Sequence, residues 1–418
     1  MGNIVGAGIY VLIGAASGLA GNAVWLSFVL AAIVALFTGL SYAELGSVYP
    51  KAASEYTFIG KAYGRRPLSF IIEWTMLMTE IVAASTVSLG FASYFHSITG
   101  LPIVLIAAAV LIALSAITLT GIKSSLRINT ILSIVALAGL IVVISGGFVK
   151  FGSVDYTNSP NGMSGIVAAS VLVFFAFIGF DNITNLSEET RNPQKLIPRG
   201  LLISLLLSMI LYILVGLAVV SLVPWQQLST SPAPLALAAS MAFGQPAFLL
   251  LAVVALLTTF NTALVLLIVG SRIIYGMSRA GALPSAFGSL NKASAPYAAS
   301  ILVLLIALGF LSLGSIGIVA KVTSFGSLLV FAAINISLLH LRRTAPHLKR
   351  PFKAPLSVGW ISITAVLGVV SCLALLSQFD IVSALLGLAL PISGIIIYSF
   401  TDKKNLLKVD KNLHQTHE

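Results

Sequence analysis

The feature that most constrains this chain is a series of long apolar runs joined by short polar connections. A transmembrane helix needs about 20 consecutive apolar residues, and we expect twelve helices of this kind. Their residues are 1–20, 23–45, 67–95, 101–121, 128–149, 163–182, 200–223, 246–276, 299–317, 320–341, 357–378 and 382–400. Only 8% of the 418 residues are charged, whereas a soluble domain carries about 25%. Because so little polar surface remains to face water, the sequence predicts an all-α membrane protein.

The lysines and arginines test this topology, since positive residues gather in the cytoplasmic loops of membrane proteins. If the segments alternate and both termini are cytoplasmic, 21 of the 23 basic residues fall on the inner side. The other two, Lys150 and Lys321, fall outside. We therefore expect a multi-pass protein of the cytoplasmic membrane. The basic residues behind its net charge of +11 would then face the anionic lipids of the inner leaflet. This placement explains the charge, so we expect no nucleic-acid partner.

The first segment carries three glycines, Gly2, Gly6 and Gly8, among its first ten residues. Each glycine weakens a helix by about 1 kcal/mol relative to alanine. One interpretation is close helix packing, because Gly2 and Gly6 have the spacing of a Gly-x-x-x-Gly contact. The other is local unwinding, in which free N–H groups hold a carboxylate and free carbonyls hold an ammonium group. The glycines alone leave both interpretations open.

The sixth segment has a similar interruption, with Gly179 and Asp181 inside an aromatic run at residues 174–181. Two interrupted helices at corresponding places in two halves of a chain point to a binding site where the halves meet. We therefore predict one transmembrane domain at 1–400, with a first repeat at 1–150 and a second at 162–341. Two additional helices would occupy 357–400, and 401–418 would form a short cytoplasmic tail.

Several motifs resemble those of amino acid–polyamine–organocation (APC) permeases, in the same order along the chain. They are Gly6-Ala7-Gly8-Ile9-Tyr10, Tyr42-Ala43-Glu44-Leu45, Tyr49-Pro50-Lys51, Glu55-Tyr56, Glu188-Glu189-Thr190-Arg191-Asn192-Pro193, Ser271-Arg272, Met277-Ser278-Arg279, Arg342-Arg343 and Arg350-Pro351-Phe352. The resemblance implies a LeuT-type fold, which is a 5+5 inverted repeat with helices 1 and 6 interrupted. It also implies further helix before Gly6, so we expect either a truncated chain or a misassigned start.

The resemblance also implies a substrate site made largely of backbone. The substrate carboxylate would meet the N–H groups of Ala7 and Gly8, and the ammonium group would meet the carbonyls of Ile4, Phe175 and Ile178. The Phe175 ring would pack over the bound substrate. The alternative for Phe175 is an aromatic residue that faces lipid or fills the core.

Acidic residues inside predicted spans are costly and usually functional. Glu73 and Glu80 lie seven residues apart on one face of the third segment. For Glu80 three hypotheses stay open. It selects basic side chains as an anion, it carries a proton because burial disfavours the charged carboxylate, or it makes an ordinary hydrogen bond to a neighbouring helix. Asp181 follows the interruption of the sixth segment, so we expect it to anchor that backbone or a gate rather than to touch substrate. A role in proton transfer or selectivity, as for Glu80, is the alternative.

The coupling ion is not decided by the sequence. Some relatives carry a lysine on helix five where sodium-coupled relatives hold an ion, but the matching position here is Ala136. On the eighth segment, Thr258, Thr259, Asn261 and Thr262 could supply oxygen ligands to sodium. Ordinary hydrogen bonds explain the same residues, and we favour that interpretation. Proton coupling, sodium coupling and exchange all remain open, and no other cofactor is expected.

The sequence favours a secondary active transporter over an enzyme. The five histidines lie outside the interiors of the predicted spans, no His/Cys cluster has the spacing of metal ligands, and no nucleophile–base pair is evident. In some relatives a cysteine in the loop between helices three and four forms a disulfide with a glycoprotein partner. The matching segment here, His96-Ser97-Ile98-Thr99-Gly100, has no cysteine, so we expect no such partner. The expected partners are an amino acid or amine substrate and the lipid bilayer, with the chain a monomer or homodimer. The alternatives are a polyamine or other organic amine permease and a non-transporting amino acid sensor.

Overall fold

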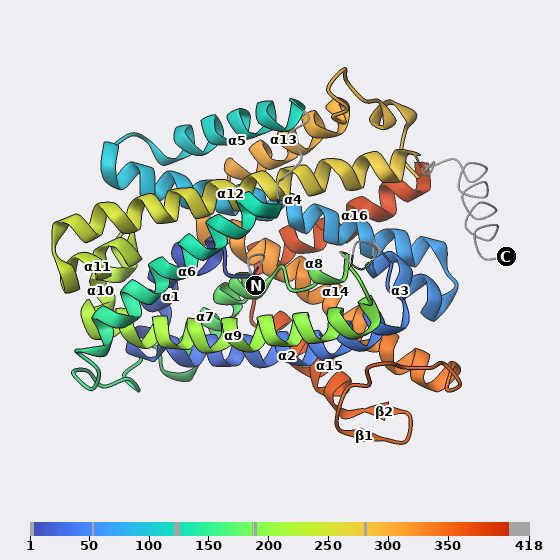
Figure 1. The fold of residues 1–418 in the computed structure, drawn as a ribbon, viewed down its shortest axis with the longest axis horizontal. Helices are drawn as coiled ribbons and strands as arrows, with labels where there is room; N and C mark the ends of the chain where they lie inside the picture. The colour runs from blue at the N-terminus through green and yellow to red at the C-terminus, as the bar shows by residue number, and fades with distance from the viewer. Residues whose placement is uncertain are drawn as a thin grey trace.

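The computed structural model of the chain describes residues 4–51, 54–120, 126–185, 187, 190–279 and 282–400. The predicted tail, 401–418, and the motif residues Glu188 and Glu189 lie outside this part. The described residues are mostly helical, and long helices such as α2, α4, α9 and α12 run lengthwise through the molecule (Figure 1). The long helices are α2 (Val24–Val48), α4 (Arg66–Thr99), α6 (Leu126–Phe148), α9 (Pro193–Leu222), α12 (Gln245–Arg279) and α14 (Ile316–Thr344).

The shorter elements lie between and beside these helices. The helices among them are α1 (Ala7–Ala20), η1 (Gly21–Ala23), α3 (Ser54–Tyr63), α5 (Ile103–Leu119), α7 (Gly162–Val173), η2 (Phe174–Phe177), α8 (Asn182–Asn185), α10 (Trp225–Thr230), α11 (Pro234–Phe243), η4 (Ser285–Gly288), α13 (Tyr297–Leu311), α15 (Ile363–Leu376) and α16 (Ile381–Phe400). Strands β1 (Ser357–Val358) and β2 (Ile361–Ser362) form one antiparallel hairpin, in which Ser357 lies opposite Ser362 and Val358 opposite Ile361.

Local sequence signals explain where several helices begin. Proline, which has no N–H to lose, occupies the first turn of α4, α9 and α11. The hydroxyl of Ser315 accepts a hydrogen bond from the N–H of Ile318 at the start of α14, and that of Ser362 accepts one from Ala365 at the start of α15. Such side-chain caps satisfy N–H groups that the helix itself leaves free.

Eight helical stretches of the described residues are long and apolar enough to cross a membrane. One of them, Ala7–Val48, contains both α1 and α2. Helix α1 ends within this stretch at Gly21, whose backbone has φ +62°. The helices α5, α13 and α15 coincide with predicted spans but have only 10–17 residues. The predicted total of twelve spans is therefore not confirmed, and the 5+5 inverted repeat stays a prediction.

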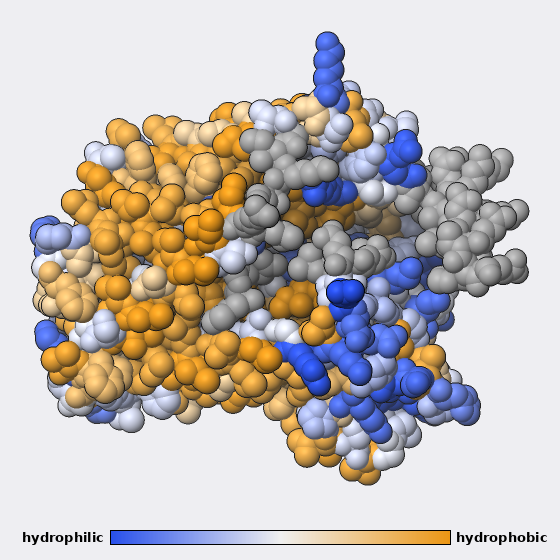
Figure 2. Space-filling model, in the orientation of Figure 1, coloured by the Kyte–Doolittle hydropathy of each residue, from blue (hydrophilic) through white to orange (hydrophobic). Residues whose placement is uncertain are grey.

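The surface and the core fit a membrane environment. Figure 2 shows apolar residues over most of one face and polar residues gathered at the end where α16 ends. Inside, α2 packs along α9, and α4 packs against both α12 and α14. The helical chain of the sixth segment is interrupted, as the sequence predicts. Helix α7 gives way to the 3₁₀ turn η2, Ile178 is extended with ψ 145°, and Gly179 has φ +106° before α8 begins.

Candidate functional site

The start of α1 is a buried helix end. Residues 4–6 are not helical, and α1 begins at Ala7, which is 1% exposed. No side chain caps this end, so the N–H groups of its first turn have no partner within the helix. The positive end of the helix dipole adds to their attraction for an anion. The local geometry can therefore hold a carboxylate, which is the role that the resemblance implies for Ala7 and Gly8.

The start of α1 touches the interrupted sixth segment at Gly8. A Cβ atom placed on Gly8 would lie 2.6 Å from the Cα of Ala176 in η2. Such a contact is far closer than atoms tolerate, so only glycine lets α1 approach η2 this closely. The sequence signalled Gly8 through its effect on helix stability, and the structure gives it a steric reason as well.

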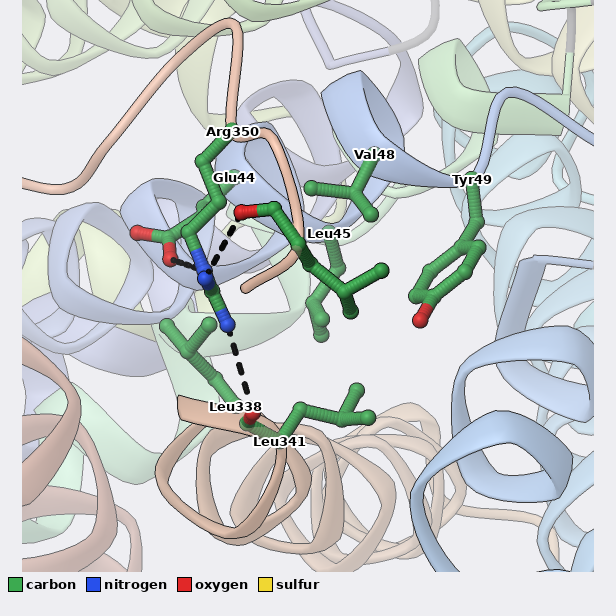
Figure 3. A pocket seen from close by; sticks show the side chains of 8 residues that line it. Glu44, Leu45, Val48, Tyr49, Leu338, Leu341 and Arg350 are labelled. Carbon is green, nitrogen blue, oxygen red and sulfur yellow. Dashed lines mark hydrogen bonds and ion pairs between the residues drawn. The ribbon is translucent and has the colours of Figure 1, made fainter. Parts of the chain in front are cut away.

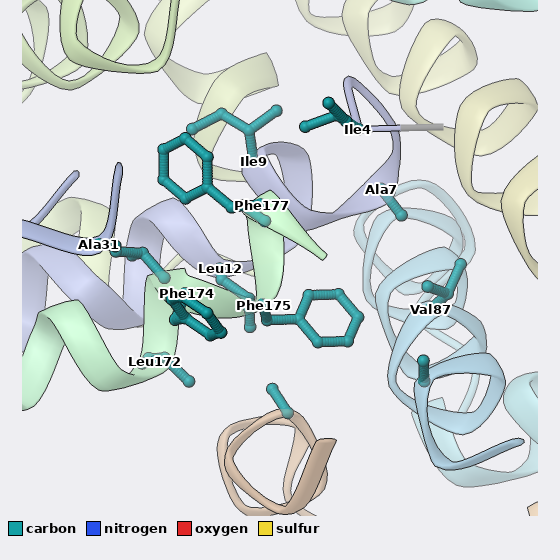
Figure 4. Close-up of a cluster of buried hydrophobic side chains, with 14 of the residues drawn as sticks. Ile4, Ala7, Ile9, Leu12, Ala31, Val87, Leu172, Phe174, Phe175 and Phe177 are labelled. Atoms are coloured by element: carbon teal, nitrogen blue, oxygen red, sulfur yellow. The ribbon is translucent and has the colours of Figure 1, made fainter. Parts of the chain in front are cut away.

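Phe175 points into the protein rather than toward lipid. The close-up in Figure 4 shows its ring extending from η2 toward Val87 of α4, with Ala7 on the same side. Phe175 is 7% exposed, so the interpretation of a lipid-facing aromatic is wrong. Whether the ring covers a substrate or simply fills the core stays a prediction, as does the role of Ile178.

The backbone carbonyls near this contact are already partly engaged. The carbonyl of Ile4 accepts the N–H of Gly6 at 2.8 Å and the hydroxyl of Tyr212 at 2.7 Å. A carbonyl oxygen has two lone pairs, so both acceptor positions of Ile4 are used here. The carbonyl of Phe175 accepts one bond, from the N–H of Ile178 at 3.2 Å. Of the expected ammonium ligands, Ile4 is thus the most heavily engaged.

Sequence reasoning missed Tyr212. Its hydroxyl lies 2.7 Å from the carbonyl of Ile4 and 3.1 Å from that of Ala176, and its side chain is fully buried. A signal was present, because a tyrosine within the apolar run of α9 needs a partner for its hydroxyl. The identity of that partner was not readable, since Ile4 lies 208 residues away along the chain.

Glu80 lies beside α8 rather than at the level of Phe175. One carboxylate oxygen accepts the side-chain amide of Asn182 at 3.1 Å, and the other is buried without a hydrogen-bond partner in the described part. Val87, which the Phe175 ring approaches, is seven residues or about 10 Å further along α4. The interhelical hydrogen bond that we considered for Glu80 is present, and one oxygen remains available for a further role.

Asp181 contacts its own interrupted segment. One of its carboxylate oxygens accepts the N–H of Gly179 at 3.1 Å, and its carbonyl accepts the hydroxyl of Thr184 at 2.6 Å. The Thr184 hydroxyl also lies 2.8 Å from the hydroxyl of Ser54 in α3. These contacts are those of an anchor for the broken backbone.

Two further buried acids surround this region. Glu55 of α3 accepts the hydroxyls of Tyr42 at 2.9 Å and Ser54 at 2.8 Å. Glu73 of α4 accepts the N–H of Tyr56 at 3.1 Å. Burial raises the pKa of Glu55, which lies outside the predicted spans. Together with Glu80 and Asp181, these residues make a buried acidic region on the α3 side of the interrupted sixth segment.

The oxygens proposed for a sodium ion have ordinary partners. The hydroxyls of Thr258, Thr259 and Thr262 donate to carbonyls one turn earlier in α12, at 2.7, 2.7 and 2.9 Å. The amide of Asn261 donates to Asn129 of α6 at 2.8 Å. Thr262 lies beside the residue that precedes α1, where a Cβ on Gly6 would lie 3.0 Å from its hydroxyl oxygen. These contacts are the ordinary hydrogen bonds that we favoured for these residues, and a sodium site stays a prediction.

Ala136, at the position where some relatives carry a lysine, makes a backbone contact instead. The carbonyl of Ala136 accepts the hydroxyl of Tyr10 at 2.5 Å, and the carbonyl of Tyr10 accepts the hydroxyl of Tyr94 at 2.9 Å. A tyrosine hydroxyl from α1 thus links α1 to α6 at this point without a charged group.

Several permease-like motif residues meet in one buried ion cluster. Glu44 at the end of α2 accepts Arg342 Nε at 2.9 Å and the N–H of Ala354 at 2.7 Å, and Arg350 Nε lies 3.1 Å from it. Figure 3 shows Glu44 and Arg350 lining a small cavity with Leu338. Its volume is about 10 Å³, which is room for about one water molecule, so this cavity is not a substrate site.

The chain is similar to known proteins over most of its length. Residues 1–399 match the family model described as amino acid permease. The branched-chain amino acid permease of Bacillus subtilis is 31% identical over 97% of this chain and 91% of its own length. The methylthioribose transporter of Bacillus subtilis is 31% identical over 85% of this chain and 81% of its own length. The vacuolar cationic amino acid transporter 4 of Arabidopsis thaliana is 31% identical over 83% of this chain and 62% of its own length.

Proposed function

This chain belongs to the amino acid permease family, and we propose that it is a secondary active transporter that moves amino acids across the cytoplasmic membrane by alternating access. The observation that carries the proposal is the contact between the uncapped start of α1 and the interrupted sixth segment, at Gly8 and Ala176. Interrupted helices that meet inside a transporter supply free backbone groups to a polar solute. Both termini would be cytoplasmic, and the repeats 1–150 and 162–341 would move relative to each other.

In this proposal the backbone recognises what all α-amino acids share. The uncapped N–H groups of Ala7 and Gly8 hold the carboxylate, and the carbonyls of Phe175 and Ile178 hold the ammonium group. An amine without a carboxylate would leave the end of α1 unmatched. This difference favours amino acids over polyamines and other organic amines.

We propose amino acids with apolar side chains as the substrate class. The apolar side chains of Phe175 and Val87 lie on the same side as Ala7 (Figure 4), and Glu80 is about two helical turns away along α4. A B. subtilis relative that is similar over almost the whole chain is named a branched-chain amino acid permease. The second candidate is a cationic amino acid, whose long side chain would reach the unpartnered oxygen of Glu80.

The proposed coupling is to protons through Glu80. A buried carboxyl with one oxygen unpartnered can gain and lose a proton without breaking its bond to Asn182. The threonine hydroxyls of α12 each donate to a carbonyl of their own helix, which leaves their oxygen lone pairs able to bind a sodium ion, so sodium coupling is the second mode. Exchange of one amino acid for another is the third mode that the experiment must separate.

Uptake into proteoliposomes tests the proposal. The purified chain is reconstituted, and labelled leucine and labelled lysine are offered under a proton gradient, a sodium gradient, or with unlabelled amino acid inside. We expect accumulation of leucine under the proton gradient. Accumulation only with internal amino acid would identify an exchanger, and leucine binding without accumulation would identify a sensor. No binding or uptake of either amino acid would contradict the proposed function.

A further inference from the structure

The hairpin between α14 and α15 projects sideways from the helical body. In Figure 1 strands β1 and β2 stand away from the other elements beside α15. The two-residue turn between Val358 and Ile361 begins with Gly359, whose φ of +59° suits glycine. The base of the hairpin is fixed to the body, because Arg342 Nη1 donates to the Ser357 hydroxyl at 2.7 Å. It is thus a fixed projection.

The hairpin exposes apolar side chains. Leu356 is 65% exposed, Val358 66% and Trp360 45%. A contiguous apolar surface that the body does not cover marks contact with a partner or a membrane. Figure 2 shows both apolar and polar residues on this projection, which lies where the apolar surface meets the polar end of the molecule.

The helix that follows is too short to cross a bilayer alone. α15 has 14 residues, which span about 21 Å, whereas the hydrocarbon core is about 30 Å thick. Its Val366, Val370 and Leu373 are exposed, so the apolar surface of the hairpin continues along one face of α15. The hairpin therefore lies at the end of a membrane-facing surface that needs about 9 Å more apolar length.

The charges around the hairpin fit an anionic surface. No aspartate or glutamate occurs between Thr344 and Phe379, and Arg343, Lys349 and Lys353 are exposed. The guanidinium of Arg343 lies 5.6 Å from the centre of the Trp360 ring. Tryptophan prefers the boundary between headgroups and acyl chains, and an arginine stacked on it is at the right level for a lipid phosphate.

Hydrogen bonding limits how deep the hairpin can lie. A two-stranded hairpin leaves N–H and C=O groups unpaired on its outer edges, and such groups are excluded from hydrocarbon. We propose that residues 356–362 lie in the headgroup boundary of the inner leaflet, where their apolar side chains enter the bilayer and the neighbouring arginine and lysines bind anionic lipid. The proposal concerns the bilayer alone and does not depend on which solute is transported.

Site-directed labelling tests this placement. The single cysteine, Cys372, is replaced by serine, and a spin label is attached to Val358→Cys in vesicles of phosphatidylglycerol and phosphatidylethanolamine. Collisions with oxygen report lipid, and collisions with a water-soluble nickel chelate report water. We expect a higher oxygen-to-nickel ratio at 358 than at the control Lys292→Cys, an exposed loop position. Equal ratios, or protection from both agents, would overturn the proposal.

Two further measurements separate lipid charge from simple burial. In phosphatidylcholine vesicles the ratio at 358 should fall, and the double change Arg343→Gln and Lys353→Gln should remove this lipid dependence, while Lys292→Gln should leave it intact. A ratio independent of lipid charge would contradict the anionic-lipid contact. The fluorescence of Trp360 is a second probe, measured in a variant that keeps Trp360 as its only tryptophan and leaves the hairpin unaltered. Lipids brominated near the headgroup should quench this fluorescence more than lipids brominated near the chain ends.

Discussion

The hydroxyl of Tyr212 donates a hydrogen bond to the carbonyl of Ile4 over 2.7 Å, so a side chain of α9 holds the backbone immediately before α1. The same oxygen lies 3.1 Å from the carbonyl of Ala176 in η2. A tyrosine hydroxyl has one proton to donate, and the two segments share it. Any movement of α1 relative to η2 must therefore change how this one donor is used.

Removing the shared donor should impair transport. In Tyr212→Phe neither the Ile4 nor the Ala176 carbonyl keeps this bond. The loss of one neutral hydrogen bond is worth about 1 kcal/mol, so we expect uptake to fall about 5-fold. Initial rates in proteoliposomes measure it. Tyr156→Phe is the matched control, because it loses a hydroxyl contact of 2.7 Å to Ser221 at the far end of α9. Equal rates in both variants would show that the donor has no role in transport.

A methyl group on Gly8 should block the contact between α1 and η2. The added Cβ would meet the Cα of Ala176 at 2.6 Å, and overpacking of this kind costs about 1–3 kcal/mol. We expect Gly8→Ala to lose uptake while the protein still reaches the membrane. Gly200→Ala in α9 is the control, because a Cβ there meets nothing within 4 Å. Full uptake by Gly8→Ala would contradict close approach of α1 to η2 as a requirement.

The interruption of the sixth segment is predictable from the sequence because glycine and an acid inside an apolar helix are local signals. Gly179 has the positive φ that such a break requires, and Gly8 lies at the contact. Span ends were less predictable from hydropathy. The sequence predicts one helix at 357–378, which is wrong for its first six residues, because they form a hairpin that turns at Gly359. An apolar pattern does not reveal such a turn when the surrounding residues are equally apolar.

Contacts between distant residues could not be read from one sequence. Arg342 lies 298 residues from Glu44, and the motif similarity placed both without pairing them. The same holds for the partner of Tyr212. The site residues carried over from the permease resemblance stay predictions, since binding by backbone groups leaves no side-chain pattern to recognise.

Breaking the buried ion cluster should destabilise the protein strongly. Glu44 is fully buried between Arg342 and Arg350, and removing one partner of a buried pair costs about 3–5 kcal/mol. We expect Glu44→Gln to lower the thermal unfolding temperature in detergent. Asp380→Asn is the comparison, because its pair with Lys321 at 2.8 Å is partly exposed and such pairs contribute at most about 1 kcal/mol. Similar unfolding temperatures for the two variants would show that the Glu44 cluster is not stabilising.

Replacing Glu80 separates its hypotheses. Glutamine keeps the size of the side chain and can still accept the bond from Asn182, but it cannot carry a proton or a charge. If Glu80 couples transport to protons, Glu80→Gln should lose accumulation driven by a proton gradient and keep exchange of labelled leucine. If it selects cationic side chains, the variant should lose inhibition of leucine uptake by lysine.

Glu73→Gln is the matched control for this change. Glu73 lies on the same face of α4, and its carboxylate accepts the N–H of Tyr56 at 3.1 Å, a bond that the glutamine oxygen can also accept. We expect Glu73→Gln to leave both the proton dependence and the lysine inhibition intact. If Glu80→Gln also leaves both intact, its hydrogen bond to Asn182 is the whole of its role, and the proton must enter through another of the buried acids near α8 or not at all.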